Sequence, residues 1–415
     1  MSARDFDVPP AAGSAADLIA RERAVAAPNY APLPVALRSG RGEWLVDLDG
    51  RRLLDMMSAY SAVSHGHAHP RLLQALTQQA QQLAVTSRAF HTEPLAQLLE
   101  RLSALTGLPL GLPANGGAES VETAIKAARR WGYRVRGIAP DCAEIVVARG
   151  NFHGRSTTIV GFSTEADYRD GFGPFAPGFR HFDFGDLDSL AAAMGPNTAA
   201  VLIEPIQGEA GIVVPPPGFL RGARALCSER GVLLIVDEIQ SGLGRTGRWF
   251  ACDHEDVRPD AMILGKALGG GLLPISCVMG TRELMGVFDA GSHGSTFGGN
   301  PLAAAVACEA LAVIEDEGLV ERSAALGAHL LARLRAIDSP LIVAVRGRGL
   351  WAGVELDPAR APARHVVERM AERGVLTKDT HGTVVRFAPP LMIAREALDW
   401  GVDVFAEVLG EFATR

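Results

Sequence analysis

Val232-Leu-Leu-Ile-Val-Asp237-Glu-Ile-Gln240 is the stretch that decides the fold class. Its five successive apolar residues are typical of a strand that is buried on both faces, as in a parallel sheet. Similar short apolar runs recur among segments of helical length, at residues 144–148, 199–204, 261–264 and 275–279. Helices that alternate with such strands predict an α/β fold, in which helices flank both faces of a mostly parallel sheet.

The order of the expected elements divides the chain into a large and a smaller part. A chain of 415 residues is too long for one ordinary small core. The Asp49-Gly50 turn predicts a hairpin over residues 44–54. Helices are expected at 17–26, 70–83, 94–105, 119–131, 301–317, 319–336 and 363–373, and further strands at 341–345, 350–356 and 383–387. We expect an N-terminal segment (1–60) that packs with the small domain, a large domain (61–310) that contains the mostly parallel sheet, and a smaller α+β domain (311–415).

The composition is that of a globular chain with no electrostatic signature for nucleic acid or an anionic membrane. Apolar residues make up 48% and charged residues 21%, and the net charge is -7. No apolar run approaches the ~20 residues that span a bilayer. The five cysteines lack CxxC spacing, and an N-terminus with Asp5 and Asp7 has no apolar signal region. We therefore expect a cytoplasmic protein that binds neither nucleic acid nor membrane.

Polar residues that follow the expected strands are the candidates for a site, because open parallel sheets bind ligands beyond the carboxyl ends of their strands. Asp237 ends one apolar run, and Glu204 and Lys266 follow two others. Taken singly, each is compatible with an ordinary loop charge. The sequence has only three lysines: Lys126 is expected on the polar side of a helix and Lys378 in a polar loop. Lys266 is thus the candidate for covalent attachment of an aldehyde cofactor.

A phosphate site is expected where Asn115-Gly-Gly117-Ala-Glu119 leads into a helix. The free N–H groups and the dipole of a helix N-terminus bind anions, and glycines remove side-chain obstruction. Glycine before a helix is also a common structural feature. The phosphate site is therefore predicted only in combination with Lys266, the candidate for attachment of the cofactor. The glycines that follow Lys266 do not form a nucleotide phosphate loop, because Ala267 stands where Ser or Thr is needed.

Two further groups of residues have a functional and a structural interpretation. Phe152 and Arg155 lie in a loop after an expected strand, where the ring can cover a flat heterocycle and the guanidinium can bind a carboxylate or form a surface ion pair. His65, His67 and His69 alternate, without the acidic or cysteine ligands that would complete a metal site. We predict turn and helix-entry roles for the histidines, and no metal.

Taken together, the sequence resembles the class III pyridoxal-phosphate-dependent aminotransferases, most closely their ornithine aminotransferase branch, from residue 28 to residue 390. The resemblance is carried by residues 29–37, 59–63, 86–90, 170–175, 204–211, 237–240, 244–249, 264–266, 293–301 and 386–390. It implies a fold-type I transferase, with pyridoxal 5'-phosphate (PLP) as the cofactor and a homodimer with shared active sites.

The resemblance also implies which residues hold the cofactor. Lys266 would bind PLP covalently and move the substrate proton between carbon atoms. Asp237 would pair with the ring nitrogen and keep it protonated. The remaining contacts would be Gln240 at the ring hydroxyl, Phe152 on the ring face, Gly117 and Ala118 at the phosphate, and Ser295 and Thr296 from a neighbouring subunit.

The implied substrates are L-ornithine and 2-oxoglutarate. The products would be glutamate and glutamate 5-semialdehyde, which cyclises to pyrroline-5-carboxylate, in a reaction between arginine breakdown and proline synthesis. Tyr30 and Arg155 would bind the α-amino and α-carboxylate groups of ornithine, and Tyr60 would recognise its chain. Arg386 would bind the α-carboxylate of 2-oxoglutarate, and Glu209 would pair with Arg386 while ornithine is bound.

Two positions depart from the pattern of the family and keep alternatives open. Gly116 stands where the family usually has a Ser or Thr near the phosphate, and His153 is Trp in some ornithine enzymes and His in acetylornithine enzymes. An aminotransferase for N-acetylornithine or 4-aminobutyrate is the close alternative, against which Tyr30 and Tyr60 argue. A non-catalytic PLP-binding protein is the alternative from another class, and the intact lysine–aspartate pair argues against it.

Overall fold

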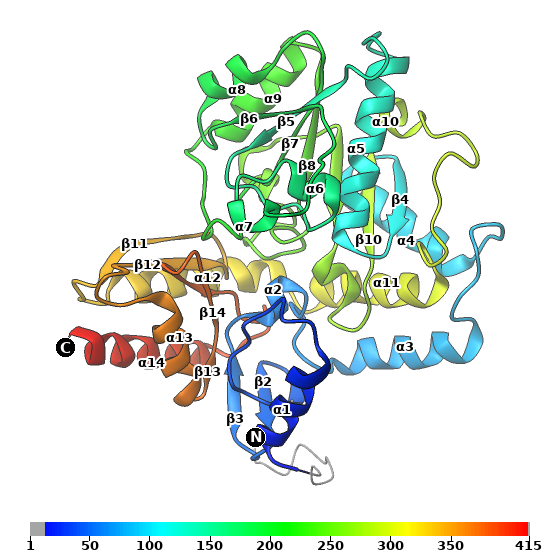
Figure 1. Cartoon of the computed structure of the whole chain (residues 1–415). Helices are drawn as coiled ribbons and strands as arrows, with labels where there is room; N and C mark the ends of the chain where they lie inside the picture. Colours follow the sequence, from blue (N-terminus) through cyan, green and yellow to red (C-terminus); the bar gives the residue numbers. More distant parts are fainter. Residues whose placement is uncertain (1–12, 414–415) are drawn as a thin grey trace.

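The computed structural model describes residues 13–413 (Figure 1), so the expectation that rested on Asp5 and Asp7 lies outside the described residues. Its longer helices are α1 (Ala15–Val25), α3 (Pro70–Gln82), α4 (Glu93–Thr106), α5 (Gly117–Arg134), α9 (Phe219–Glu229), α11 (Pro301–Asp316), α12 (Leu319–Arg335), α13 (Ala363–Glu372) and α14 (Arg395–Ala413). Short ones are α2 (Ser58–Ser61), α6 (Thr157–Gly161), α7 (Ala166–Arg169), α8 (Leu187–Ala193) and α10 (Arg282–Met285), with 3-10 helices η2 (Ala251–Glu255) and η3 (Lys266–Gly269).

A seven-stranded sheet forms the centre of the large part, in the order β4-β10-β9-β8-β7-β5-β6. The strands are β4 (Leu110–Ala114), β5 (Glu144–Ala148), β6 (Phe179–Phe182), β7 (Thr198–Ile203), β8 (Leu233–Asp237), β9 (Ala261–Leu264) and β10 (Ser276–Gly280). Only β10 runs against its neighbours, β4 and β9. The predicted α/β fold with a mostly parallel sheet is therefore confirmed.

Helices cover both faces of this sheet, as its continuously apolar strands require. Leu234 and Val236 of β8 belong to the core on one face, where α4, α9 and α11 pack. Leu233 and Ile235, the alternate residues, belong to the core beneath α5 on the other face. Every residue of β8 is buried, which explains why the strand shows no polar alternation.

Two four-stranded sheets lie outside the large one. The first has the order β1-β2-β3-β13, with β1 (Leu37–Arg41), β2 (Trp44–Asp47), β3 (Arg52–Asp55) and β13 (Val375–Leu376). The predicted hairpin is β2–β3, and Val375 of β13 pairs in parallel with Leu54 of β3. The second has the order β11-β12-β15-β14, with β11 (Ile342–Gly347), β12 (Ala352–Leu356), β14 (Lys378–Thr380) and β15 (Val384–Phe387).

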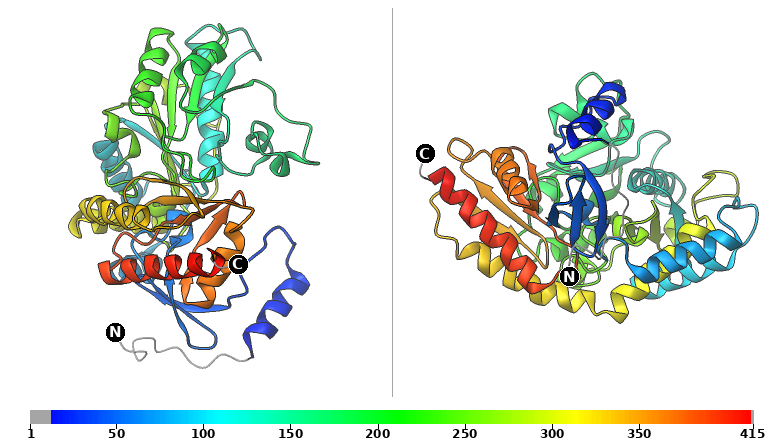
Figure 2. Two further views of the ribbon diagram at one scale, coloured as in Figure 1. Left: turned by 90° about the vertical axis from the view of Figure 1, so that its left-hand side faces the viewer. Right: turned by 90° about the horizontal axis from the view of Figure 1, so that it is seen from below.

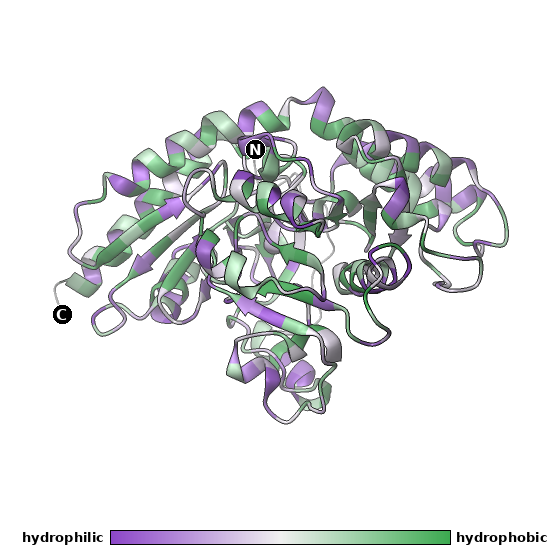
Figure 3. Cartoon of the chain, turned by 90° about the horizontal axis from the view of Figure 1, so that it is seen from above, coloured by the Kyte–Doolittle hydropathy of each residue, from purple (hydrophilic) through white to green (hydrophobic). Residues whose placement is uncertain are grey.

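The outer helices frame these sheets. Seen from below, α11 and α12 follow one another along one side of the molecule, with α3 beside α11 and α14 beside α12 (Figure 2). Hydrophilic and hydrophobic residues alternate along the outer helices (Figure 3), as expected for helices with one buried face. By contrast, α1 has no buried residue and stands apart from the main body in Figure 2. No helix between residues 13 and 413 has the length and apolar character needed to cross a membrane.

Candidate active site

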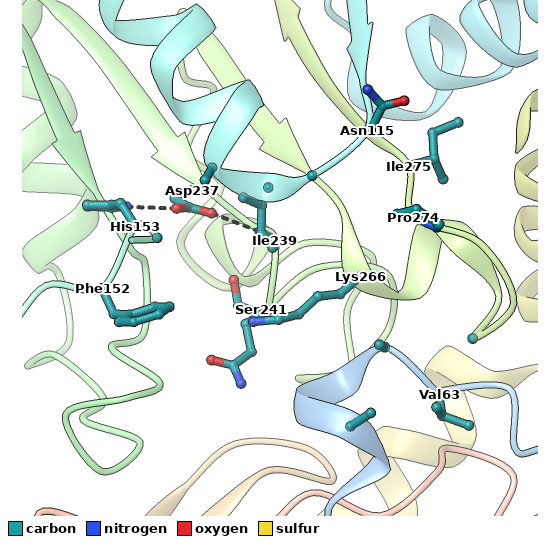
Figure 4. A pocket seen from close by; sticks show the side chains of 18 of the residues that line it. Val63, Asn115, Phe152, His153, Asp237, Ile239, Ser241, Lys266, Pro274 and Ile275 are labelled. Carbon is teal, nitrogen blue, oxygen red and sulfur yellow. Dashed lines mark hydrogen bonds and ion pairs between the residues drawn. The ribbon is translucent and has the colours of Figure 1, made fainter. Parts of the chain in front are cut away.

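A cavity of about 460 Å³ opens at the carboxyl ends of the parallel strands. Its lining comes from the end of β8, from the segments that follow β5, β7, β8 and β9, from the start of α5, and from α2 and the segment after it. Figure 4 shows side chains from these separate elements around one space. Of the residues predicted for the cofactor, the lining includes Gly117, Ala118, Phe152, Asp237, Gln240 and Lys266. The edge of the sheet therefore brings together residues that are up to 149 positions apart, from Gly117 to Lys266.

Lys266 follows β9 after a single glycine and faces this cavity (Figure 4). Its backbone is left-handed, with φ of 46°, a conformation that is uncommon outside glycine and tends to occur at functional sites. Burial lowers the pKa of its amine below the ordinary value, although the carboxylates of Glu209 and Asp237 act in the opposite direction. A lowered amine pKa favours the neutral form, which is the form that attacks an aldehyde.

Asp237 is fixed from two sides. Its Oδ2 lies 2.7 Å from Nδ1 of His153, and its Oδ1 accepts a hydrogen bond from the backbone N–H of Ile239 at 3.0 Å (Figure 4). Burial opposes a charge on His153, but the hydrogen bond and the charge of Asp237 prevail and raise the pKa of the imidazole. The pair therefore presents a buried carboxylate in a fixed orientation.

Glu204 supports the loop that carries Phe152. Its carboxylate accepts hydrogen bonds from the backbone N–H groups of Phe152, at 2.9 Å, and Gly208, at 3.3 Å. Burial raises the pKa of Glu204 to about 7. Nearby His153 acts to lower this pKa, and Asp237 acts to raise it further. Phe152 is thus held at the cavity by a carboxyl group whose charge changes near neutral pH.

The start of α5 has the properties of an anion site. Its N-cap residue Gly116 makes no side-chain capping bond, so N–H groups of the first turn remain available beside the cavity. A Cβ at Gly116 would meet nothing within 4 Å, whereas a Cβ at Gly117 would lie 3.0 Å from Cδ1 of Ile239. An anionic group at this end, an amine with a lowered pKa and a carboxylate for a ring nitrogen fit the PLP that the resemblance implies.

Arg386 and Glu209 form an ion pair of 2.8 Å between Nη1 and Oε1. Arg386 is only 3% exposed, and its guanidinium lies 5.4 Å from the centre of the Tyr60 ring. Burial acts to raise the pKa of Glu209, but the positive charges of Arg386 and then Lys266 outweigh it, so the pKa of Glu209 is lowered. Burial, and then Glu209, raise the pKa of Tyr60. The predicted substrate residues Tyr60, Glu209 and Arg386 are therefore close together, and Glu209 and Arg386 interact electrostatically with Lys266.

Tyr60 stands in a left-handed turn, the short element α2. Ser58, Ala59, Tyr60 and Ser61 have φ values of 44°, 46°, 58° and 75°. For residues other than glycine this conformation costs roughly 1–2 kcal/mol each, so it persists only where surrounding contacts enforce it. One such contact is a 3.4 Å hydrogen bond from Nε2 of Gln240 to the backbone oxygen of Tyr60.

The predicted substrate residues Tyr60, Glu209 and Arg386 do not belong to the lining of this first cavity, and neither do the four remaining predicted site residues. Tyr30 is 80% exposed and borders a second cavity of about 420 Å³, which Tyr60 also lines. Arg155 is exposed, and its guanidinium stacks 3.5 Å from the centre of the Tyr168 ring. Ser295 and Thr296 are exposed, and Oγ of Ser295 accepts a hydrogen bond from the side-chain amide of Asn115 at 3.2 Å.

The three alternating histidines have separate partners. Nε2 of His65 lies 3.0 Å from the backbone oxygen of Ala310, and Nε2 of His67 lies 2.7 Å from Oδ2 of Asp55. His69 is the N-cap residue of α3, and its Nε2 lies 3.0 Å from Glu317. Over residues 13–413, no group of His, Cys, Asp or Glu side chains has an arrangement that would hold a metal ion.

The sequence did not indicate two buried groups at this site. The hydrogen bond from His153 to Asp237 joins residues 84 positions apart, and its only sequence signal is the position of His153 beside Phe152. Arg245 is 0% exposed and lies beneath the left-handed turn. A buried arginine has no sequence signature that separates it from an exposed one, because both occur in polar loops.

Comparison with known proteins shows which families and structures this chain is similar to. The model of the family "Aminotransferase class-III" matches residues 25–409. An ornithine aminotransferase of Halalkalibacterium halodurans is 55% identical over 396 residues, which cover 95% of this chain and 99% of that protein. Among solved structures, an ornithine aminotransferase from Toxoplasma gondii, described with partial occupancy of PLP at its active site, matches with a TM-score of 0.95 and 42% identity, covering 97% of this chain and 96% of that one. An acetylornithine aminotransferase from Elizabethkingia anophelis matches with a TM-score of 0.87 and 41% identity, covering 96% and 100%.

Proposed function

The chain belongs to the class-III aminotransferases, which depend on PLP, and we propose that it transfers the δ-amino group of L-ornithine to 2-oxoglutarate. The products are glutamate 5-semialdehyde, which cyclises to pyrroline-5-carboxylate, and glutamate. The observation that carries the proposal is the ion pair between Arg386 and Glu209 in reach of Lys266. This reaction belongs to the metabolism of arginine and proline.

When bound, PLP supplies an aldehyde and an electron-accepting ring for amino-group transfer. Lys266 would hold the cofactor through its amine and would carry the proton that moves between carbon atoms. Asp237 would keep a proton on the ring nitrogen, and His153 would keep the Asp237 carboxylate in the orientation that this requires. Phe152 would cover the ring and exclude water from one face. The N-terminus of α5 would bind the phosphate, with Gly117 and Ala118 at its start.

Glu209 and Arg386 would let one site accept two unlike substrates. 2-Oxoglutarate brings an α-carboxylate that pairs with Arg386, so Glu209 must give up the guanidinium. Ornithine presents its distal amine instead and leaves the cation without a substrate carboxylate. In that state Glu209 would pair with Arg386, which removes the cost of an unpaired buried charge.

The assignment of ornithine over N-acetylornithine rests on the two tyrosines. Tyr60 lines the second cavity, and its ring also lies close to the guanidinium of Arg386. Tyr30 lines the second cavity, where it would contact the free α-amino group of ornithine. An acetyl group on this nitrogen would obstruct that contact, and Arg155 would bind the α-carboxylate beside it.

We further propose a homodimer with shared sites, located in the cytoplasm. Ser295 and Thr296 are exposed and do not line the cavity of their own chain. They would reach the phosphate of a neighbouring subunit. Two large apolar side chains, Phe90 and Phe297, are 67% and 53% exposed in the single chain and would be covered in the dimer. Light scattering coupled to gel filtration measures this: a monomeric mass at micromolar concentration contradicts the dimer.

Product identification tests the reaction itself. The purified holoenzyme is given ornithine and 2-oxoglutarate, and the semialdehyde is trapped in its cyclised form. N-acetylornithine and 4-aminobutyrate are compared as donors by the rates of their half-reactions. We expect ornithine to react fastest. A faster reaction with N-acetylornithine would assign the chain to the acetylornithine branch, and no amine-dependent spectral change would leave only PLP binding.

A further inference from the structure

Arg245 is a fully buried cation that the proposed reaction does not use. Its exposed fraction is 0%, and within residues 13–413 no carboxylate forms an ion pair with it. A buried charge is unfavourable unless hydrogen bonds replace its lost water. The guanidinium of Arg245 therefore has to be held by neutral acceptors, and the identity of these acceptors indicates what it does.

The acceptors come from three parts of the chain, which Arg245 joins next to the left-handed turn that carries Tyr60. Nη1 of Arg245 donates to the backbone oxygens of Leu350, at 2.9 Å, and Pro389, at 2.6 Å. Nη2 donates to Oγ of Ser58, at 3.1 Å, and to Oγ of Ser64, at 3.0 Å. A planar guanidinium can serve four acceptors in fixed directions, which a single ammonium group cannot do.

Both serines pass this constraint on to the left-handed turn Ser58–Ser61. Oγ of Ser58 donates to the backbone oxygen of Ala388 at 2.6 Å, and Oγ of Ser64 donates to the backbone oxygen of Ser61 at 2.9 Å. The carboxylate of Asp55 accepts from the backbone N–H of Ser58 at 2.7 Å. The turn is thus tied at its beginning and at its end, and both ties lead to Arg245.

Tyr60 is the residue whose position depends on these ties. It lies inside the turn, and its ring is 5.4 Å from the guanidinium of Arg386. We propose that Arg245 is a positioning residue of the substrate site: its guanidinium keeps Ser58–Ser61 left-handed and so fixes the ring of Tyr60 beside Arg386. The role of Tyr60 toward ornithine rests on the proposed function, whereas the effect of Arg245 on the turn does not.

Three buried serines provide a matched test. Ser58→Ala and Ser64→Ala each remove a hydroxyl that links Arg245 to the turn. Ser323→Ala is the control, because Oγ of Ser323 also donates to a carbonyl, that of Arg245 at 3.0 Å, and accepts an N–H, that of Leu350 at 3.2 Å, but does not touch the turn. Arg245→Lys keeps the charge and removes the planar fork.

Hydrogen exchange of the holoenzyme, read on a peptide that covers residues 56–66, gives a measure that does not require activity. We expect Ser64→Ala and Arg245→Lys to accelerate this exchange roughly tenfold, the factor that one neutral hydrogen bond contributes. Ser323→Ala should leave it unchanged. Equal exchange in Ser64→Ala and Ser323→Ala overturns the inference, even if Arg245→Lys does not fold.

Kinetics then separate positioning from general destabilisation. We expect Ser64→Ala to raise the KM for ornithine severalfold, in line with the loss of one hydrogen bond, at nearly constant kcat. In a Tyr60→Leu background the same change should have no further effect on KM. Additive effects in this double-mutant cycle contradict the inference. A wild type that does not use ornithine refutes the proposed function and leaves the exchange measurement as the test of Arg245.

Discussion

His153, in the loop after β5, and Asp237, the last residue of β8, face each other with Nδ1 and Oδ2 2.7 Å apart, and both side chains are almost completely buried. The hydrogen bond fixes the carboxylate that would hold the proton of the cofactor ring. We expect His153→Phe to lower kcat roughly 10–100-fold, the range seen when a supporting partner is removed from an active group. Single-turnover rates of each half-reaction measure this loss, and a loss confined to one half-reaction contradicts a role at the shared ring.

Glu209 is expected to matter in only one half of the cycle. Glu209→Gln removes the negative charge that pairs with Arg386 at 2.8 Å while ornithine is bound. Breaking a buried pair on one side costs several kcal/mol, so kcat/KM for ornithine should fall at least ~10-fold. The rate with glutamate should stay close to that of the wild type, since the substrate carboxylate then replaces Glu209. Equal losses with both amino donors would refute the exchange of partners.

Lys266 is expected to be irreplaceable. Lys266→Ala should lower the transamination rate by roughly 10²–10⁴ or more, because it removes a proton carrier as well as the covalent link. After borohydride reduction, mass spectrometry should find the cofactor attached to the wild type and absent from the variant. Lys126→Ala is the control, since Lys126 is exposed and hydrogen-bonds His293 outside the cavity. Attached cofactor in Lys266→Ala would place the reactive amine elsewhere.

Glu204 predicts a pH dependence of stability. Burial raises its pKa from 4.5 to about 7, so the folded protein binds this proton more tightly than the unfolded chain. As the pH rises from about 4.5 through 7, the group therefore destabilises the cofactor-free protein, by on the order of 3 kcal/mol in total. Glu204→Gln lacks this loss. Melting temperatures of the two proteins are compared at pH 5 and pH 8. The melting temperature of the variant relative to the wild type should be higher at pH 8 than at pH 5, and the same difference at both pH values would exclude a raised pKa of Glu204.

Gly116 and Gly117 predict opposite effects on cofactor affinity. A Cβ at Gly116 enters open space, so Gly116→Ser adds a hydroxyl beside the anion site without a clash. We expect PLP to bind roughly 3–10-fold more tightly, as for one added hydrogen bond to a charged group. Gly117→Ser brings a Cβ to 3.0 Å from Ile239 and should weaken binding. Spectroscopic titration of the cofactor-free protein measures both, and weaker binding in Gly116→Ser would contradict an anion site here.

The elements that could be predicted best have a local signal, either a continuous apolar run or a helix-length segment between start and stop residues. The buried run that became β8 and the helix that became α11 agree with the structure within one residue or so. The helices α9 and α14 were not predicted. The strands β4 and β6 were not predicted, because Leu110–Ala114 contains Gly and Pro, and Phe179–Phe182 mixes aromatic residues with Arg and His. Their pairing with neighbours in the sheet decides their conformation, and that pairing has no local signal.

At the site, residues at the ends of predicted strands could be placed from the sequence, as Asp237 and Lys266 were. The left-handed turn that carries Tyr60 could not, since Ser58, Ala59 and Ser61 have no preference for positive φ. Two contacts from outside the turn impose this conformation: one with Arg245, which is far away in the sequence, and one with Asp55, which precedes the turn. The part that escaped prediction is therefore the part that depends on long-range hydrogen bonds.

The parallel pairing of β3 with β13 limits when the N-terminal sheet can be completed during synthesis on the ribosome. Leu54 finds its partner Val375 only after 320 further residues have been translated. The N-terminal sheet, which leads into the turn with Tyr60, therefore lacks its strand β13 until late in translation. The central sheet, by contrast, has all its strands once Gly280 has been translated. All residues that line the cofactor cavity have been translated by Ile275, whereas Arg386, the partner of Glu209 and Tyr60, is added only when the chain is nearly finished.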